Sequence, residues 1–139
     1  MTVVTPPDVE RWACRYLADQ LADIPGLICD NAEPDDYRGD YPLVIVNDVP
    51  GALTGRVTYD WTIGITLRWG SRQDVHASKA LAARILGIMT QDPEIMLAPG
   101  SPIAEIIDGG TSGPTLVTED HDVARYYTTI DYTVAGEIH

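Results

Sequence analysis

Residues 56–70 read R-V-T-Y-D-W-T-I-G-I-T-L-R-W-G, and apolar side chains alternate with polar or small ones over this whole stretch. The apolar positions are Val57, Tyr59, Trp61, Ile63, Ile65, Leu67 and Trp69. Successive side chains of a β-strand point to opposite faces of a sheet, because the backbone is pleated. The alternation therefore predicts one long strand with a buried face and a solvent-facing one.

This strand is long for the domain that must contain it. At about 3.3 Å per residue it would span roughly 46 Å. A compact domain of 139 residues has a diameter of about 37 Å. Two arrangements resolve the mismatch. Either the strand bends, with Gly64 as the favoured position, or one of its ends projects toward a neighbouring molecule.

Amphipathic helices are expected before and after this strand in the sequence. Residues 5–7, T-P-P, mark the start of the first helix, whose apolar residues keep helical spacing until the Pro-Gly pair at 25–26. Residues 71–74, S-R-Q-D, have the S-x-x-D form of a capping box and predict the start of the second helix. The Asp-Pro pair at 92–93 is expected to end it.

The remaining segments predict further strands. An apolar run at residues 41–49 is expected to be buried on both faces, and its short connection to the long strand indicates antiparallel pairing. Other strands are expected at residues 27–29, 103–107, 115–118 and 124–135, with a flexible glycine-rich turn at 109–113. The predicted fold is one α+β domain over residues 1–139, in the order α-β-β-β-α-β-β-β. Its sheet is largely antiparallel or mixed, with the two helices packed on one face.

Composition excludes several classes of protein. The formal net charge is −12 and 45% of the residues are apolar. This charge argues against a protein that grips nucleic acid and fits one that avoids DNA or pairs with a basic partner. No apolar run has the length of a membrane span, and the N-terminus lacks a signal-peptide pattern, so we expect a cytoplasmic setting during synthesis. Cys14 and Cys29 match no metal-binding or redox spacing and are expected to be ordinary thiols.

The sequence offers no clear site for chemistry. The acidic segment at residues 30–40 lacks the D-x-D-x-D-G spacing of a calcium loop, so a solvated loop is the favoured interpretation. Ser112 and His121 could belong to a hydrolytic triad only on paper, because G-T-S-G at 110–113 is not a nucleophile elbow. The three histidines share no metal-ligand spacing, and no phosphate-binding loop is present. We expect no catalytic residues, cofactor or metal, and no enzyme.

Two oppositely charged patches point instead to association between identical subunits. The second predicted helix carries a basic stripe that continues into small residues, and the loop at 30–40 is acidic. Head-to-tail packing joins two different patches of identical chains and closes into a ring when the rotation allows. The predicted interface residues are Arg72, His76, Lys79, Ala83 and Gly87 on the helix and Asp35, Asp36 and Asp40 in the loop. The alternative that both are plain solvated surfaces stays open.

The order of these elements resembles a known family. An N-terminal amphipathic helix, a buried strand, the very long alternating strand, a Ser-capped helix and a final R-Y-Y-x-x-I-D-Y-T-V strand at residues 125–134 resemble the tail terminator (tail-completion) proteins of long-tailed bacteriophages. The resemblance covers roughly residues 5–136 and is one of architecture and pattern. Because the family has no short diagnostic motif, the resemblance assigns no functional residue.

The resemblance implies a structural virion protein in the tail or neck, assembled in the host cytoplasm. Such a protein forms a homo-oligomeric ring, usually a hexamer, that caps the head-proximal end of the tail tube and stops tube polymerisation. Its partners are the major tail tube protein and a neck or head-completion protein, and DNA only passes through the lumen. Under this hypothesis, candidate tube or neck contacts are Asn47, Asp48, Leu53, Thr54 and Arg56. The alternatives are another neck component, such as a head-closure connector, or a monomeric ligand-binding or enzymatic α+β domain.

Overall fold

A computed structural model describes residues 3–53, 55–71, 73, 75–117 and 122–139. In these residues the chain has an α+β fold, as the sequence predicts. The elements are β1 (Val4–Thr5), α1 (Val9–Gln20), β2 (Ile28–Asp30), β3 (Leu43–Leu53), β4 (Thr58–Ser71), α2 (His76–Met89), α3 (Glu94–Leu97), β5 (Ile103–Leu116), β6 (Val123–Ala135) and β7 (Glu137–Ile138). None of the described helices is long and apolar enough to cross a membrane.

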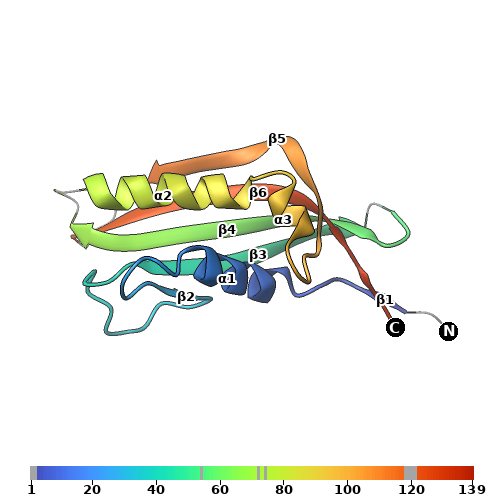
Figure 1. Cartoon of the computed structure of the whole chain (residues 1–139), viewed down its shortest axis with the longest axis horizontal. Helices are drawn as coiled ribbons and strands as arrows, with labels where there is room; N and C mark the ends of the chain where they lie inside the picture. Colours follow the sequence, from blue (N-terminus) through green and yellow to red (C-terminus); the bar gives the residue numbers. More distant parts are fainter. Residues whose placement is uncertain (1–2, 54, 72, 74, 118–121) are drawn as a thin grey trace.

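The main sheet is mixed. Its five strands lie in the order β2-β3-β4-β6-β5, with β4 at the centre (Figure 1). Only β2 and β3 run parallel, and every other neighbouring pair is antiparallel. The antiparallel β3–β4 hairpin confirms the pairing expected from its short connection. The sequence did not predict β1 and β7, which form a separate two-stranded antiparallel ribbon.

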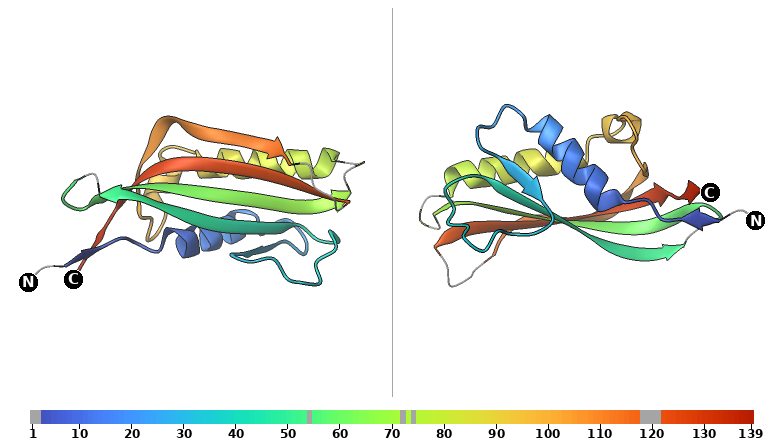
Figure 2. Two further views of the ribbon diagram at one scale, coloured as in Figure 1. Left: turned by 180° about the vertical axis from the view of Figure 1, so that it is seen from behind. Right: turned by 90° about the horizontal axis from the view of Figure 1, so that it is seen from below.

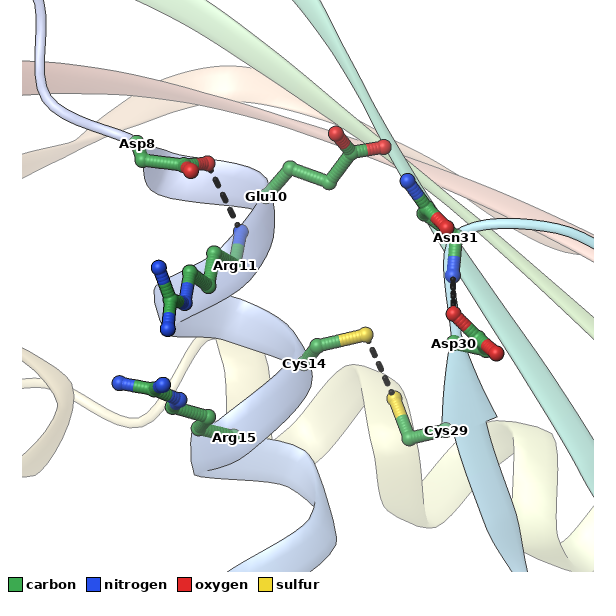
Figure 3. A pocket seen from close by; sticks show the side chains of 8 residues that line it. All are labelled: Asp8, Glu10, Arg11, Cys14, Arg15, Cys29, Asp30 and Asn31. Carbon is green, nitrogen blue, oxygen red and sulfur yellow. Dashed lines mark hydrogen bonds between the residues drawn. The ribbon is translucent and has the colours of Figure 1, made fainter.

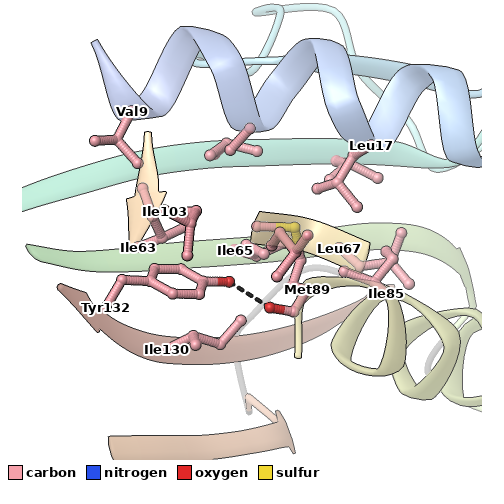
Figure 4. Close-up of a cluster of buried hydrophobic side chains, with 14 of the residues drawn as sticks. Val9, Leu17, Ile63, Ile65, Leu67, Ile85, Met89, Ile103, Ile130 and Tyr132 are labelled. Atoms are coloured by element: carbon pink, nitrogen blue, oxygen red, sulfur yellow. Dashed lines mark hydrogen bonds between the residues drawn. The ribbon is translucent and has the colours of Figure 1, made fainter. Parts of the chain in front are cut away.

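Both long helices cover the same face of this sheet (Figure 2). α1 packs over β2 and β3, and α2 packs over β4, β5 and β6. Odd-numbered side chains of β4 point toward these helices, and Trp61, Ile63 and Ile65 among them are buried. In register, Trp61 lies beside Tyr132 and Ile63 beside Ile130, so neighbouring strands contribute to one continuous core (Figure 4). The predicted buried face of the long strand is confirmed.

The opposite face of β4 is not fully solvated, contrary to the prediction. Thr66 and Arg68 are both buried on it. They lie in register with Ile45 and Leu43, which are buried on the same face of β3. The alternating pattern alone could not reveal this burial, because the residues that cover Arg68 come from the distant segment at 31–42.

The length of β4 is accommodated by extension rather than by a break. β4 runs the length of the molecule, and its hairpin with β3 reaches beyond the layer of helices (Figure 2). Gly64 has a different role from the predicted bend. A Cβ atom at this position would lie 2.7 Å from the hydroxyl of Tyr127, so glycine here leaves room for a tyrosine side chain that lies across the strand.

The glycine-rich segment at residues 109–113 is part of a strand and not the predicted turn. β5 is continuous from Ile103 to Leu116 and replaces the two shorter strands expected at 103–107 and 115–118. Its pairing with β6 shifts register between Ile106 and Thr111 and again between Ser112 and Thr115. The glycine-rich segment therefore forms β-bulges within β5, and pairing with β6 continues on both sides of them. Of the second predicted strand, Thr118 lies outside the described residues.

The second helix begins later than predicted. Ser71 ends β4, and its Oγ accepts a hydrogen bond from the Gln73 N–H at 3.0 Å. This bond closes a local turn, and α2 starts only at His76, with Val75 as an N-cap that offers no side-chain hydrogen bond. Arg72 and Asp74, the other residues of the predicted capping box, lie outside the described part of the chain. The element order is thus only roughly as expected.

Candidate functional site

The hairpin end of the sheet carries exposed apolar side chains that the helices do not cover. Leu53 on β3 is 57% exposed, and Ile138 on β7 is 65% exposed. We define the hairpin-end patch as Val3, Leu53, Val57 and Ile138, which are all exposed. Both chain termini lie at this same end (Figure 1). Exposed apolar residues are ordinary when scattered, but their concentration at one end marks a candidate contact surface.

Backbone hydrogen bonds fasten this end together. The Gly136 N–H donates to the carbonyl of Val57 at 2.6 Å, which joins the end of β6 to the turn of the β3–β4 hairpin. The Val3 N–H donates to the His139 carbonyl at 3.2 Å, and the His139 N–H donates back at 2.8 Å. Segments from the two ends of the chain thereby support the patch, and local sequence patterns could not have indicated that they meet.

The residues predicted to contact a tube or neck protein are divided between two places. Leu53 and Arg56 are exposed at the hairpin end. Asn47 and Asp48 lie farther back on β3, where Asn47 is exposed and Asp48 is half-buried beside α1. Thr54 lies outside the described residues. The structure therefore brings only part of this predicted set to one surface.

An acidic cluster that the sequence did not indicate lies between α1 and β3. Carboxylate oxygens of Asp8, Glu10 and Asp48 lie within 4.8 Å of one another. Burial raises the pKa of the Glu10 carboxyl, and the negative charges of Asp48 and Asp8 raise it further. Such a cluster of oxygens is the part of the described chain that could bind a hard cation. Only the docking of α1 against β3 brings the three residues together.

The acidic loop predicted to be fully solvated is instead held against the sheet. Arg68 forms an ion pair with Glu33, and its guanidinium carbon lies 5.7 Å from the centre of the Tyr37 ring. The Tyr37 hydroxyl lies 2.7 Å from the Tyr41 carbonyl and 2.6 Å from that of Arg68, so its single proton is shared between two acceptors. The Gly70 N–H also donates to the Gly39 carbonyl at 3.0 Å. Asp35, Asp36 and Asp40, which belong to the predicted interface, stay exposed.

The other predicted interface patch lies on the outer side of α2. His76, Lys79, Ala83 and Gly87 are exposed there, and Arg72 lies outside the described residues. α2 lies toward the β5 edge of the sheet, whereas the acidic loop lies at the β2 edge (Figure 1). The two patches are therefore on opposite edges of the molecule.

Arg84, a basic residue of α2 outside the predicted interface, forms an ion pair within the chain. The guanidinium of Arg84 contacts both carboxylate oxygens of Asp23, at 2.7 and 3.0 Å, and also donates to the Gln20 carbonyl. The hydrogen bonds to Arg84 lower the pKa of the Asp23 carboxyl. This pair ties α2 to the turn that follows α1.

The two cysteines line an open cavity of about 300 Å³ between α1 and β2 (Figure 3). The Cys29 thiol donates a hydrogen bond to the Cys14 sulfur, with 3.3 Å between the two Sγ atoms. Their separation by 15 positions in the sequence gave no sign of this contact, although both are free thiols as expected. The lining residues are Asp8, Glu10, Arg11, Cys14, Arg15, Cys29, Asp30 and Asn31.

The described structure gives no support to a hydrolytic triad that includes Ser112 and His121. Ser112 is exposed on β5, and His121 lies outside the described residues.

Comparison with known proteins adds no family: the chain matches no protein-family model and no curated protein.

Proposed function

We propose that the chain is a structural virion subunit that forms a ring, expected to be a hexamer, at the head-proximal end of a phage tail tube. In this role it stops polymerisation of the tube and offers a surface for joining the head. The proposal assigns no catalytic residue, cofactor or metal. The observation that carries it is the hairpin-end patch, where the long β3–β4 hairpin extends past the helices and exposes apolar side chains.

The hairpin end is suited to contact with another protein because it exposes apolar side chains and is held by backbone hydrogen bonds. Covering apolar surface stabilises a complex by roughly 25 cal/mol per Å² removed from water. A surface that is already ordered also loses little conformational entropy on binding. The hydrogen bond from Gly136 to Val57 and the pairing of β1 with β7 supply that order. We assign this end to the major tail tube protein or to the neck protein.

The charged patches suit contact between neighbouring copies of the chain. Asp35, Asp36 and Asp40 lie at the β2 edge, and Lys79 and His76 lie toward the β5 edge. Opposite charges at opposite edges favour head-to-tail association, which closes into a ring at a suitable rotation. The net charge of −12 per chain also suits a ring through which DNA passes without being bound.

Native mass measurement at several protein concentrations tests the ring. A hexamer is expected, and a strict monomer at the highest concentration would overturn the proposal. Addition of the cognate tube protein separates a terminator from another neck component. Only a terminator should limit the length of the tubes, so unlimited growth in its presence would support the head-closure alternative.

Two matched variants test the hairpin end. Leu53→Asp places a charge in the hairpin-end patch, and we expect it to keep the ring but lose control of tube length. Leu97→Asp makes the same change at another exposed position, on α3, and is expected to behave like the wild type. Equal capping by both variants would remove the hairpin end from the contact.

A further inference from the structure

We propose that Cys14 and Cys29 form a reversible disulfide, made by exchange with a low-molecular-weight disulfide, that fastens β2 to α1. This inference is independent of the proposed ring. It rests on the contact between the two thiols, which come from adjacent elements and have sulfur atoms 3.3 Å apart (Figure 3).

The geometry requires little movement. Cys14 lies in the middle of α1 and Cys29 in the middle of β2, and these two elements pack against each other. A disulfide holds its sulfur atoms about 2.05 Å apart. The sulfurs must therefore approach by little more than an ångström from their present hydrogen-bonded distance. Both side chains are half-buried at the wall of the open cavity of about 300 Å³, which gives a small reagent access.

The hydrogen bond assigns different roles to the two cysteines. Cys29 donates its proton to the Cys14 sulfur. This bond lowers the pKa of the Cys14 thiol and raises that of Cys29. The thiolate is the nucleophile in disulfide exchange, so Cys14 is the attacking residue and Cys29 the resolving one.

Exchange then takes two balanced steps. The Cys14 thiolate attacks one sulfur of the reagent, the S–S bond of the reagent breaks, and one half leaves as a thiol after taking up a proton. Cys29 next loses its proton and attacks the Cys14 sulfur, which expels the second half as a thiol. Two protein thiols are oxidised, and one reagent disulfide is reduced to two thiols.

The disulfide would restrain β2, an edge strand of the main sheet. β2 has three residues, forms one edge of the main sheet and leads directly into the acidic loop. A cross-link from its centre to α1 would restrict local opening of this edge and reduce the freedom of the unfolded chain. For a closed loop of this size we expect the melting temperature to rise by roughly 10 °C.

Intact mass after treatment with oxidised glutathione tests the reaction on the full chain. The wild type is expected to become lighter by two hydrogens, and digestion should recover the Cys14 and Cys29 peptides as one linked pair. A persistent glutathione adduct, a covalent dimer or no reaction would each overturn the proposal. These outcomes need no variant and hence no assumption about the folding of one.

Single variants test the two roles. Cys29→Ser should keep glutathione attached to Cys14, because the resolving thiol is missing. Cys14→Ser should react more slowly, because burial and the negative charge of Asp30 still raise the pKa of the Cys29 thiol when Cys14 is absent. Faster reaction of Cys14→Ser than of Cys29→Ser would overturn the assignment of roles.

Thermal melting tests the fastening. The oxidised wild type should melt above the reduced wild type, and dithiothreitol should reverse the difference. The double variant Cys14→Ser/Cys29→Ser is the matched control and should not respond to either reagent. Equal melting of oxidised and reduced wild type would show that the bond does not restrain the fold.

Discussion

The hydroxyl of Tyr132, in β6, donates a 2.6 Å hydrogen bond to the main-chain carbonyl of Met89, in the last turn of α2 (Figure 4). The last carbonyls of a helix have no partner within the helix. The sheet thus supplies a hydrogen bond that the end of α2 needs, at a position where both residues are fully buried. This bond links the last turn of α2 to β6.

Removal of this hydroxyl should destabilise the fold. Tyr132→Phe leaves the Met89 carbonyl buried without its donor, which is expected to cost about 1–3 kcal/mol. Urea denaturation monitored by circular dichroism measures the loss. Tyr127→Phe makes the same chemical change at an exposed ring on the other face of β6 and should cost less. Wild-type stability of Tyr132→Phe would mean that the Tyr132 bond contributes nothing.

Tyrosine ionisation should make the protein sensitive to alkali. Burial raises the pKa of Tyr132, Tyr37 and Tyr16 above the ordinary value of about 10. Above pH 10 the unfolded chain therefore binds fewer protons than the folded one, and the free energy of unfolding falls as pH rises. Denaturation measured from pH 8 to 11 should show a decline in stability that steepens from about pH 10, where unfolded tyrosines ionise. Tyr132→Phe should flatten the decline, and an unchanged slope would contradict this assignment.

The ion pair of Arg68 and Glu33 should hold the acidic loop against the sheet. Glu33→Gln removes the charge that faces a buried guanidinium, and we expect a loss of about 1–3 kcal/mol, because Glu33 itself is partly exposed. Amide exchange in the loop should accelerate. Asp36→Asn, at an exposed carboxylate of the same loop, should leave both quantities unchanged. If the two variants behave alike, the docking does not depend on this pair.

Trp61 tests the orientation of the central strand. Trp61→Asp would place a charge in the core between the sheet and the helices, and a loss of about 4 kcal/mol or more is expected. Val49→Asp places the same charge on the opposite face, at a side chain that is 57% exposed, and should have little effect. Thermal melting distinguishes them. Wild-type-like melting of Trp61→Asp would mean that the two faces are assigned the wrong way round.

The features that follow a short sequence period were predictable. The buried face of β4, with Trp61 and Ile63, follows from alternation, which is a property of neighbouring residues. Asp8 caps α1 by accepting a hydrogen bond from the Arg11 N–H at 3.1 Å, close to the helix start that the proline pair indicated. Both the buried face of β4 and the start of α1 are determined by residues that are close together in the sequence.

The remaining features depend on contacts between distant segments. Arg68 looked solvent-facing by alternation, but Glu33 comes from 35 positions away to cover it. Gly113 looked like part of a turn because it belongs to the glycine-rich run at residues 109–113, but in the structure it lies in β5 with a φ of +97°. A Cβ atom there would lie 2.4 Å from the Tyr127 carbonyl, so the glycine permits close pairing within the sheet. The contact of Cys14 with Cys29 likewise exists only after α1 docks on β2.

Charge reversal offers a direct test of the proposed seam between subunits. Lys79→Glu on α2 should weaken the ring, because an acid would then face the acidic loop of the neighbouring copy. Asp36→Lys should weaken it for the converse reason, and the two changes together should restore assembly. Arg15→Glu makes the same charge change at an exposed position on α1 and controls for the altered net charge. Native mass spectra of all four variants at one salt concentration provide the measurement. If Lys79→Glu and Asp36→Lys each leave the ring intact, the charged patches do not form the seam, and another pair of surfaces must join the subunits.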